Sequence, residues 1–246
     1  IRIITLEKNS GLMMARSFGY KAATGKYICF CDSDDTLPLD SIEKLYNKAV
    51  TENADIVIGN LEFIGTDSLR FNSVLKYGSD KMSVFKSLLR REATHNLCGK
   101  LYKNDILQKF PYIVYEGCTN SEDLGAFYQF VDNCNKIVAI DTIVYNYYQN
   151  NQSSTRVKYT DKVFNSMFLM RETALNVLSK YPELTDEVNK WVIKDLSNLF
   201  PYYNKKGYLR KKLKDFNLFS FLSVSNIIKY FHILPGLRYV IKIYIL

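Results

Sequence analysis

The stretch Phe30-Cys-Asp-Ser-Asp-Asp-Thr-Leu-Pro38 places three carboxylates within four positions, directly after the apolar run Tyr27–Cys31. The apolar run is typical of a buried strand. Like charges this close repel each other, and burying them unpaired is costly. We therefore expect a cation to neutralise Asp32, Asp34 and Asp35, and their hard oxygen ligands suit magnesium, calcium or manganese.

Other interpretations of the same stretch compete with a metal site. A strand end followed by a helix from Ser41, capped by Asp40, is ordinary loop chemistry. An EF-hand calcium loop is rejected, because its sixth position, counted from Asp32, is Leu37 instead of Gly. The stretch also looks like the D-x-D-x-T motif of haloacid dehalogenase phosphatases, with Asp32 as the nucleophile and Asp34 as the acid/base.

The composition is that of a globular chain. Its 246 residues are 47% hydrophobic, which is enough for a sizeable core. No apolar run approaches the roughly 18 to 20 residues of a membrane-spanning helix. The five cysteines form no C-x-x-C pair and are expected to be reduced thiols.

Charge is distributed unevenly along the chain. Residues 1–156 carry 18 basic and 18 acidic side chains, whereas residues 157–246 carry 15 basic and 7 acidic ones. This asymmetry predicts two parts, 1–156 and 157–246, and suggests that the second part faces an anionic partner.

Strand and helix patterns alternate through the first part. Strands are expected at 1–6, 27–31, 54–64, 98–102 and 137–147, and helices at 11–24, 40–53, 80–91 and 121–131. This alternation favours an α/β fold with a largely parallel sheet, whose ligand sites lie at the carboxyl ends of the strands. From residue 161 the pattern is helical.

The flanks of the acidic stretch carry a longer motif. The segment E7-K-N-S-G-L-M-M-A-R16-S-F-G-Y-K-A-A-T-G-K-Y-I-C-F-C-D-S-D-D35 resembles the family 2 glycosyltransferases of GT-A fold, of the bacterial polysaccharide type. Later segments follow the same order, namely K100-L-Y-K103, S121-E-D-L124 and Y145-N-Y-Y-Q-N-N-Q-S-S-T155. The resemblance covers about residues 1–156, and the phosphatase interpretation has no comparable second block.

The resemblance implies specific roles at the site. Asp34 would be a direct ligand of Mn²⁺ or Mg²⁺, with Asp32 contacting the metal or the ribose, and Arg16 would lie near the nucleotide. Asp123 would be the general base that activates the acceptor hydroxyl, and a single displacement would invert the anomeric carbon. From the residues alone, Glu122 and Asp123 equally suit the first turn of a helix, where acids interact well with its dipole.

The resemblance also implies the partners and a departure from the pattern. The donor would be a nucleotide-diphosphate sugar, most simply a UDP-sugar, and the acceptor a glycan or lipid-linked hydroxyl in bacterial surface polysaccharide synthesis. The family's usual opening of about 50 to 60 residues, with its nucleotide-binding strands, is not in this sequence, so we expect a GT-A domain incomplete at the N-terminus. A truncated binding or scaffold protein without turnover is the non-enzyme alternative.

The basic second part suggests a membrane surface. Basic residues at 205–214 precede an apolar and aromatic segment at 216–246. Such a pattern fits a helix lying on an anionic bilayer, or a helical extension with a solvated basic face. Nucleic acid is not an expected partner, because no recognition motif accompanies the charge. We expect a cytoplasmic protein, peripheral at the inner face of the cell membrane.

Overall fold

The computed structural model describes residues 1–65, 70–71, 78–149, 160–199, 214–215 and 224–229. Its contacts group the chain into two compact units, 1–166 and 167–246, so the division falls within helix α6 (Asp161–Leu178). The boundary predicted at residues 156 and 157 lies outside the described residues.

Unit 1 is built on a five-stranded sheet. The strands are β1 (Tyr27–Cys29), β2 (Ile56–Ile64), β3 (Arg70–Phe71), β4 (Lys100–Lys103) and β5 (Ile137–Tyr148). They lie in the order β1-β4-β2-β3, and β5 also pairs with β2. Its helices are α1 (Leu12–Ala22), α2 (Ser41–Glu52), α3 (Lys81–Leu89), α4 (Asn104–Lys109) and α5 (Glu122–Asp132).

The sheet is mixed. β5 is parallel to β2, but β4 lies between β1 and β2 and is antiparallel to both. β1, β2 and β5 therefore point the same way, as the predicted parallel sheet requires, whereas β4 and the short β3 run against them. Ser79, which precedes α3, lies at the start of β5, because its carbonyl oxygen accepts from the amide of Ile137 (2.8 Å), and β4 then enters the sheet from the opposite end. The predicted α/β class is confirmed.

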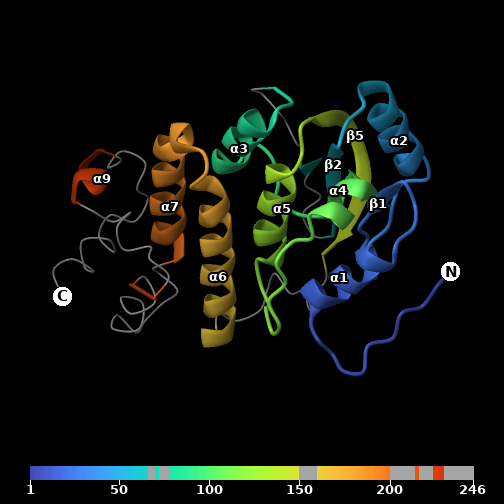
Figure 1. The fold of residues 1–246 in the computed structure, drawn as a ribbon, viewed down its shortest axis with the longest axis horizontal. Helices are drawn as coiled ribbons and strands as arrows, with labels where there is room; N and C mark the ends of the chain where they lie inside the picture. The colour runs from blue at the N-terminus through green and yellow to red at the C-terminus, as the bar shows by residue number, and fades with distance from the viewer. Residues whose placement is uncertain (66–69, 72–77, 150–159, 200–213, 216–223, 230–246) are drawn as a thin grey trace. The chain divides into compact units, whose positions relative to one another are not determined.

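Helices cover the sheet through apolar faces. α2 packs against β2, β4 and β5 and buries Leu45 and Ala49, whereas α1 contacts α4 and α5 (Figure 1). The core beneath α5 is aromatic, since the Tyr102 ring lies 5.5 Å from that of Phe30 and 5.4 Å from that of Phe130. This packing holds β4 and α5 against Phe30, the residue that leads from β1 into the acidic stretch.

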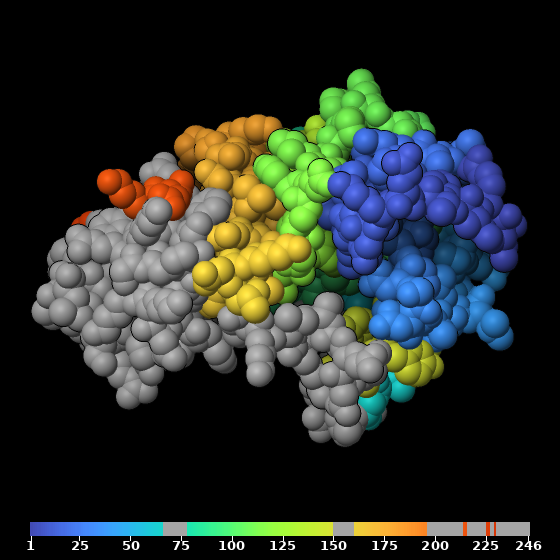
Figure 2. Space-filling view, turned by 90° about the horizontal axis from the view of Figure 1, so that it is seen from below, coloured from blue at the N-terminus to red at the C-terminus, as the bar shows by residue number. Residues whose placement is uncertain are grey.

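The first six residues are not a strand, which corrects the prediction for 1–6. No described strand pairs with this segment, and Ile1 and Ile3 are exposed. Hydrophobic β-branched residues alone do not make a strand without a partner to bury them. Arg2 of this segment binds the carbonyl oxygen of Ala22, and Lys8, just after the segment, pairs with Glu116 (Nζ–Oε1 2.7 Å). Figure 2 shows the dark-blue N-terminal residues on the surface.

Unit 2 is helical in its described part, as predicted. It contains the rest of α6, a 3₁₀ turn (Pro182–Leu184), α7 (Thr185–Leu199) and α9 (Val224–Lys229). Its core includes Phe168, Met170 and Ile193. Among the described residues, no helix is long and apolar enough to span a membrane. Most of the basic and apolar tail at 205–246 lies outside the described residues.

Candidate active site

The acidic loop begins where β1 ends. Phe30 forms an isolated bridge with Cys98, and the chain then turns, with the Asp35 amide donating to the carbonyl oxygen of Asp32 (3.2 Å). The Asp34 side chain is exposed, whereas Asp32 and Asp35 are half-buried. The loop thus lies at the carboxyl end of β1, where an α/β sheet places its ligands.

Tyr145 holds this loop in shape from strand β5. Its hydroxyl donates to Asp35 Oδ2 (2.7 Å) and accepts from the amide of Asp32 (3.1 Å). The amide of Tyr148 donates to Asp35 Oδ1 (2.8 Å). The sequence predicts a strand at 137–147 but gives no signal that Tyr145 reaches the loop, because this contact joins residues 110 positions apart.

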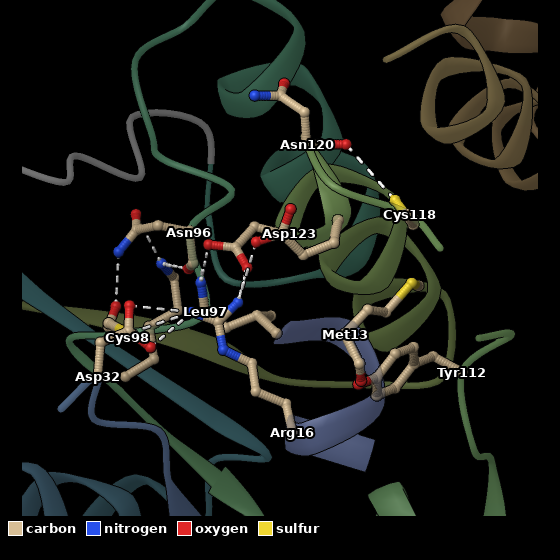
Figure 3. Close-up of polar contacts among 12 residues, drawn as sticks. Met13, Arg16, Asp32, Asn96, Leu97, Cys98, Tyr112, Cys118, Asn120 and Asp123 are labelled. Atoms are coloured by element: carbon tan, nitrogen blue, oxygen red, sulfur yellow. Dashed lines mark hydrogen bonds and ion pairs between the residues drawn. The ribbon is translucent and has the colours of Figure 1, made fainter. Parts of the chain in front are cut away.

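Arg16 of α1 joins the acidic loop to the start of α5. Its Nη2 donates to both oxygens of Asp32 (2.8 and 3.0 Å), and its Nη1 binds Asp123 and lies 3.5 Å from Glu122 Oε1 (Figure 3). The Arg16 side chain is only 7% exposed. The structure therefore brings together three of the predicted site residues, Arg16, Asp32 and Asp123, from three separate segments.

The charges of this cluster do not cancel. Burial alone lowers the pKa of Arg16, but the charges of Asp123 and Asp32 outweigh it and raise that pKa. Burial and the neighbouring Asp123 raise the pKa of Glu122. One guanidinium faces three acids, and its buried Nε has no hydrogen-bond partner among the described residues. The cluster retains negative charge that can receive a proton or a cation.

The partners of the Asp123 carboxylate belong to other segments of the chain than its own helix, α5. Its Oδ1 binds Arg16, and its Oδ2 accepts from the amide of Leu97 (3.2 Å) (Figure 3). A carboxylate has about four acceptor sites, so both oxygens can take a further partner. Glu122 and Asp123 also lie in the first turn of α5, as the alternative role beside the helix dipole requires, so the structure is compatible with both roles.

Of the three carboxylates in the acidic loop, that of Asp34 is the one most available to bind a metal ion. Asp32 is paired with Arg16, and Asp35 accepts hydrogen bonds from Tyr145 and Tyr148, so a cation that neutralises all three carboxylates stays a prediction. No hydrogen bond or ion pair to the Asp34 carboxylate is found in the described part of the chain, nor is a group of three or more metal-ligating side chains. Mg²⁺ commonly binds through one or two carboxylates together with substrate phosphates. Asp34 fits such a site, and Asp32 as a second ligand stays a prediction.

Comparisons with known proteins agree with this geometry. The family described as "Glycosyl transferase family 2" matches residues 1–112. Over these residues the chain is similar to glycosyl transferase family 2. The match includes Arg16, Asp32 and Asp34 and ends before Asp123.

Two proteins to which this chain is similar are glycosyltransferases by name. The chain is 31% identical to glycosyltransferase GlyA of Streptococcus pneumoniae over 45% of this chain and 18% of that protein. It is 24% identical to the poly(ribitol-phosphate) beta-N-acetylglucosaminyltransferase TarP of Staphylococcus aureus over 87% of this chain and 66% of that protein. The chain therefore spans less than two thirds of the length of these relatives.

A solved structure shares the fold. The crystal structure of S. aureus TarS residues 1–349 in complex with UDP-GlcNAc superposes with a TM-score of 0.70 at 18% identity, covering 87% of this chain and 64% of that one. The predicted GT-A type fold is thereby confirmed. The phosphatase interpretation finds no support in these comparisons, and its nucleophile Asp32 is held on both oxygens by Arg16.

Proposed function

We propose that this protein transfers a sugar from a nucleotide-diphosphate sugar to an acceptor hydroxyl. The observation that carries the proposal is the cluster in which Arg16 joins the acidic loop at Asp32 to the carboxylate of Asp123. Such a pairing supplies what the reaction needs, a place for the donor's leaving group next to a base for the acceptor.

The donor would lie against the acidic loop. Exposed Asp34 would hold Mn²⁺ or Mg²⁺, which when bound supplies Lewis-acid stabilisation of the leaving diphosphate. Arg16 binds both oxygens of Asp32 and holds the side chain in place, while Tyr145 fixes the backbone of the loop. UDP is the proposed nucleotide, supported by the UDP-GlcNAc complex of the TarS relative in fold.

Asp123 would act on the acceptor. One of its carboxylate oxygens takes the proton of the attacking hydroxyl as the new bond to the anomeric carbon forms. The bond between that carbon and the phosphate oxygen breaks, and the diphosphate leaves with the bonding electrons. A single displacement of this kind inverts the anomeric carbon. Arg16 and the Leu97 amide hold the carboxylate for this role.

The biological setting is proposed from the relatives and the charge. The acceptor would be a glycan or lipid-linked hydroxyl in bacterial surface polysaccharide synthesis. TarP and a matching Rhizobium meliloti protein named for succinoglycan biosynthesis support this class. The basic excess at 157–246 supports a cytoplasmic protein that binds the anionic inner face of the membrane peripherally. No nucleic acid partner is proposed.

The base assignment can be tested with Asp123→Asn. We expect UDP release from UDP-GlcNAc and other UDP-sugars, with simple sugars as acceptors, to fall by about 10²- to 10⁴-fold while UDP binding is kept. The matched control is Asp195→Asn, which alters another half-buried carboxylate paired to an arginine. Equal turnover by wild type and Asp123→Asn, or an equal loss in the control, would contradict the assignment.

A further inference from the structure

Lys100 of β4 is buried completely, which is unusual for a lysine. Removing an ammonium from water is costly unless its protons are satisfied. A methionine of similar length would fill the same space without that cost. A lysine at this position therefore calls for a reason beyond packing.

The ammonium of Lys100 is satisfied by a single loop. Its Nζ donates to the carbonyl oxygen of Asn96, and lies 3.3 Å from Asn96 Oδ1 and 3.4 Å from Thr94 Oγ1. All these acceptors are neutral oxygens. The loop ends at Cys98, whose carbonyl oxygen accepts from Asn96 Nδ2 (2.6 Å). Lys100 thus fixes the main chain immediately before Leu97.

The other side of the Leu97 peptide is held by Tyr102. The Tyr102 hydroxyl donates to the carbonyl oxygen of Leu97 (2.9 Å), and this tyrosine is also fully buried. Lys100 and Tyr102 are two apart on a strand, so both project from the same face of β4. Two buried side chains of one strand therefore bracket Leu97.

The bracketed residue contacts the proposed base. The Leu97 amide donates to Asp123 Oδ2 (3.2 Å), as the close-up shows (Figure 3). Lys100 also touches the helix that carries Asp123, because its Nζ lies 4.8 Å from the centroid of the Phe127 ring, one turn further along α5. Lys100 accordingly contacts both the loop that contains Asn96 and the helix α5 that carries Asp123.

We propose that Lys100 and Tyr102 are positioning residues that aim the Leu97 amide at Asp123 and so orient its carboxylate toward the acceptor. The inference rests on the proposed function for the role of Asp123. It gives Lys100 and Tyr102 a role at the reaction centre that packing alone does not require.

The test compares Lys100→Met and Tyr102→Phe with Lys103→Met, which makes the same change on the opposite face of β4. We expect kcat to fall about tenfold to a hundredfold in Lys100→Met and less in Tyr102→Phe, with UDP affinity unchanged. Lys103→Met keeps wild-type turnover. In the Asp123→Asn background, Lys100→Met should add no further loss, because both act through one group.

A role in structure alone gives a different result. If Lys100 only stabilised the fold, Lys100→Met would lower turnover by the same factor with and without the Asp123 carboxylate. That additivity would overturn the proposal. If Lys100→Met does not fold, Tyr102→Phe in the same two backgrounds decides the question.

A second readout does not depend on turnover. Hydrogen exchange of the Leu97 amide should quicken by about tenfold or more in Lys100→Met and Tyr102→Phe. Unchanged exchange would overturn the inference even if the protein is a transferase. Faster exchange together with full activity of Asp123→Asn would instead reject the proposed function and keep the structural link.

Discussion

Two buried arginines, Arg16 in unit 1 and Arg171 in unit 2, differ in what they bind. Arg171 contacts one carboxylate, that of Asp195, and the carbonyl oxygen of Met167 (2.8 Å). Arg16 contacts three carboxylates from two segments distant in sequence. A single buried pair ties two helices together, whereas acids in excess over the cation leave charge for a ligand or a proton. The difference marks one cluster as structural and the other as the candidate site.

The largest expected effect comes from removing each arginine. Arg16→Met and Arg171→Met should each lower the free energy of unfolding by about 3–5 kcal/mol, because partner carboxylates stay buried and unpaired. Only Arg16→Met should also weaken UDP binding, measured by titration on the folded fraction. Equal UDP affinity in the two variants would erase the distinction between the clusters.

A smaller effect comes from pH and involves Lys100, beside the Arg16 cluster. Burial lowers the pKa of Lys100 to about 7, although Asp123 and Cys98 favour its charged form. The unfolded chain then binds more protons than the folded one between pH 7 and about 10.5, so stability rises with pH in that window, by up to about 1.4 kcal/mol per unit. The free energy of unfolding of the wild type, measured with urea at pH 7.5, 8.5 and 9.5, should rise relative to that of Lys100→Met. A difference in unfolding free energy between wild type and Lys100→Met that stays constant with pH would refute the prediction.

The smallest expected effect concerns the hydroxyl of Tyr145, which shapes the acidic loop next to Arg16. Tyr145→Phe should weaken UDP binding about fivefold, which corresponds to about 1 kcal/mol. Tyr112→Phe is the matched control, because its buried hydroxyl donates to the carbonyl oxygen of Met13 (3.1 Å) away from the loop. A similar loss of UDP affinity in both variants would show a general effect of core hydrogen bonds.

The sequence predicts the site better than the contacts that build it. Arg16, Asp32 and Asp123 are singled out by motif, and alternating patterns predict most helices and strands of unit 1. Partners are harder to predict, because a contact such as that of Arg16 with Asp123 joins residues 107 positions apart. The strand predicted at 1–6 is wrong, and the antiparallel direction of β4 is not evident from the sequence, because strand pairing depends on neighbours that local pattern does not reveal.

Lys100 and Tyr145 make contacts that the sequence does not predict. Each lies in a segment that carries the family resemblance, but nothing local distinguishes a core residue from one whose polar atom reaches a distant loop. Their roles follow from the hydrogen bonds that the fold creates, to Asn96 in one case and to Asp35 in the other. Burial of a polar group therefore adds information that the motif lacks.

The most direct test of the central claim is calorimetric titration of UDP into the 246-residue protein with and without Mn²⁺. Wild type, Asp34→Ala and the control Asp40→Ala should be compared, since Asp40 is also exposed but pairs with Lys44 (2.6 Å). We predict binding that requires Mn²⁺, is lost in Asp34→Ala and is kept in Asp40→Ala. Binding that ignores Mn²⁺, or that survives in Asp34→Ala, would contradict the claim that the acidic loop holds the donor's diphosphate through a metal.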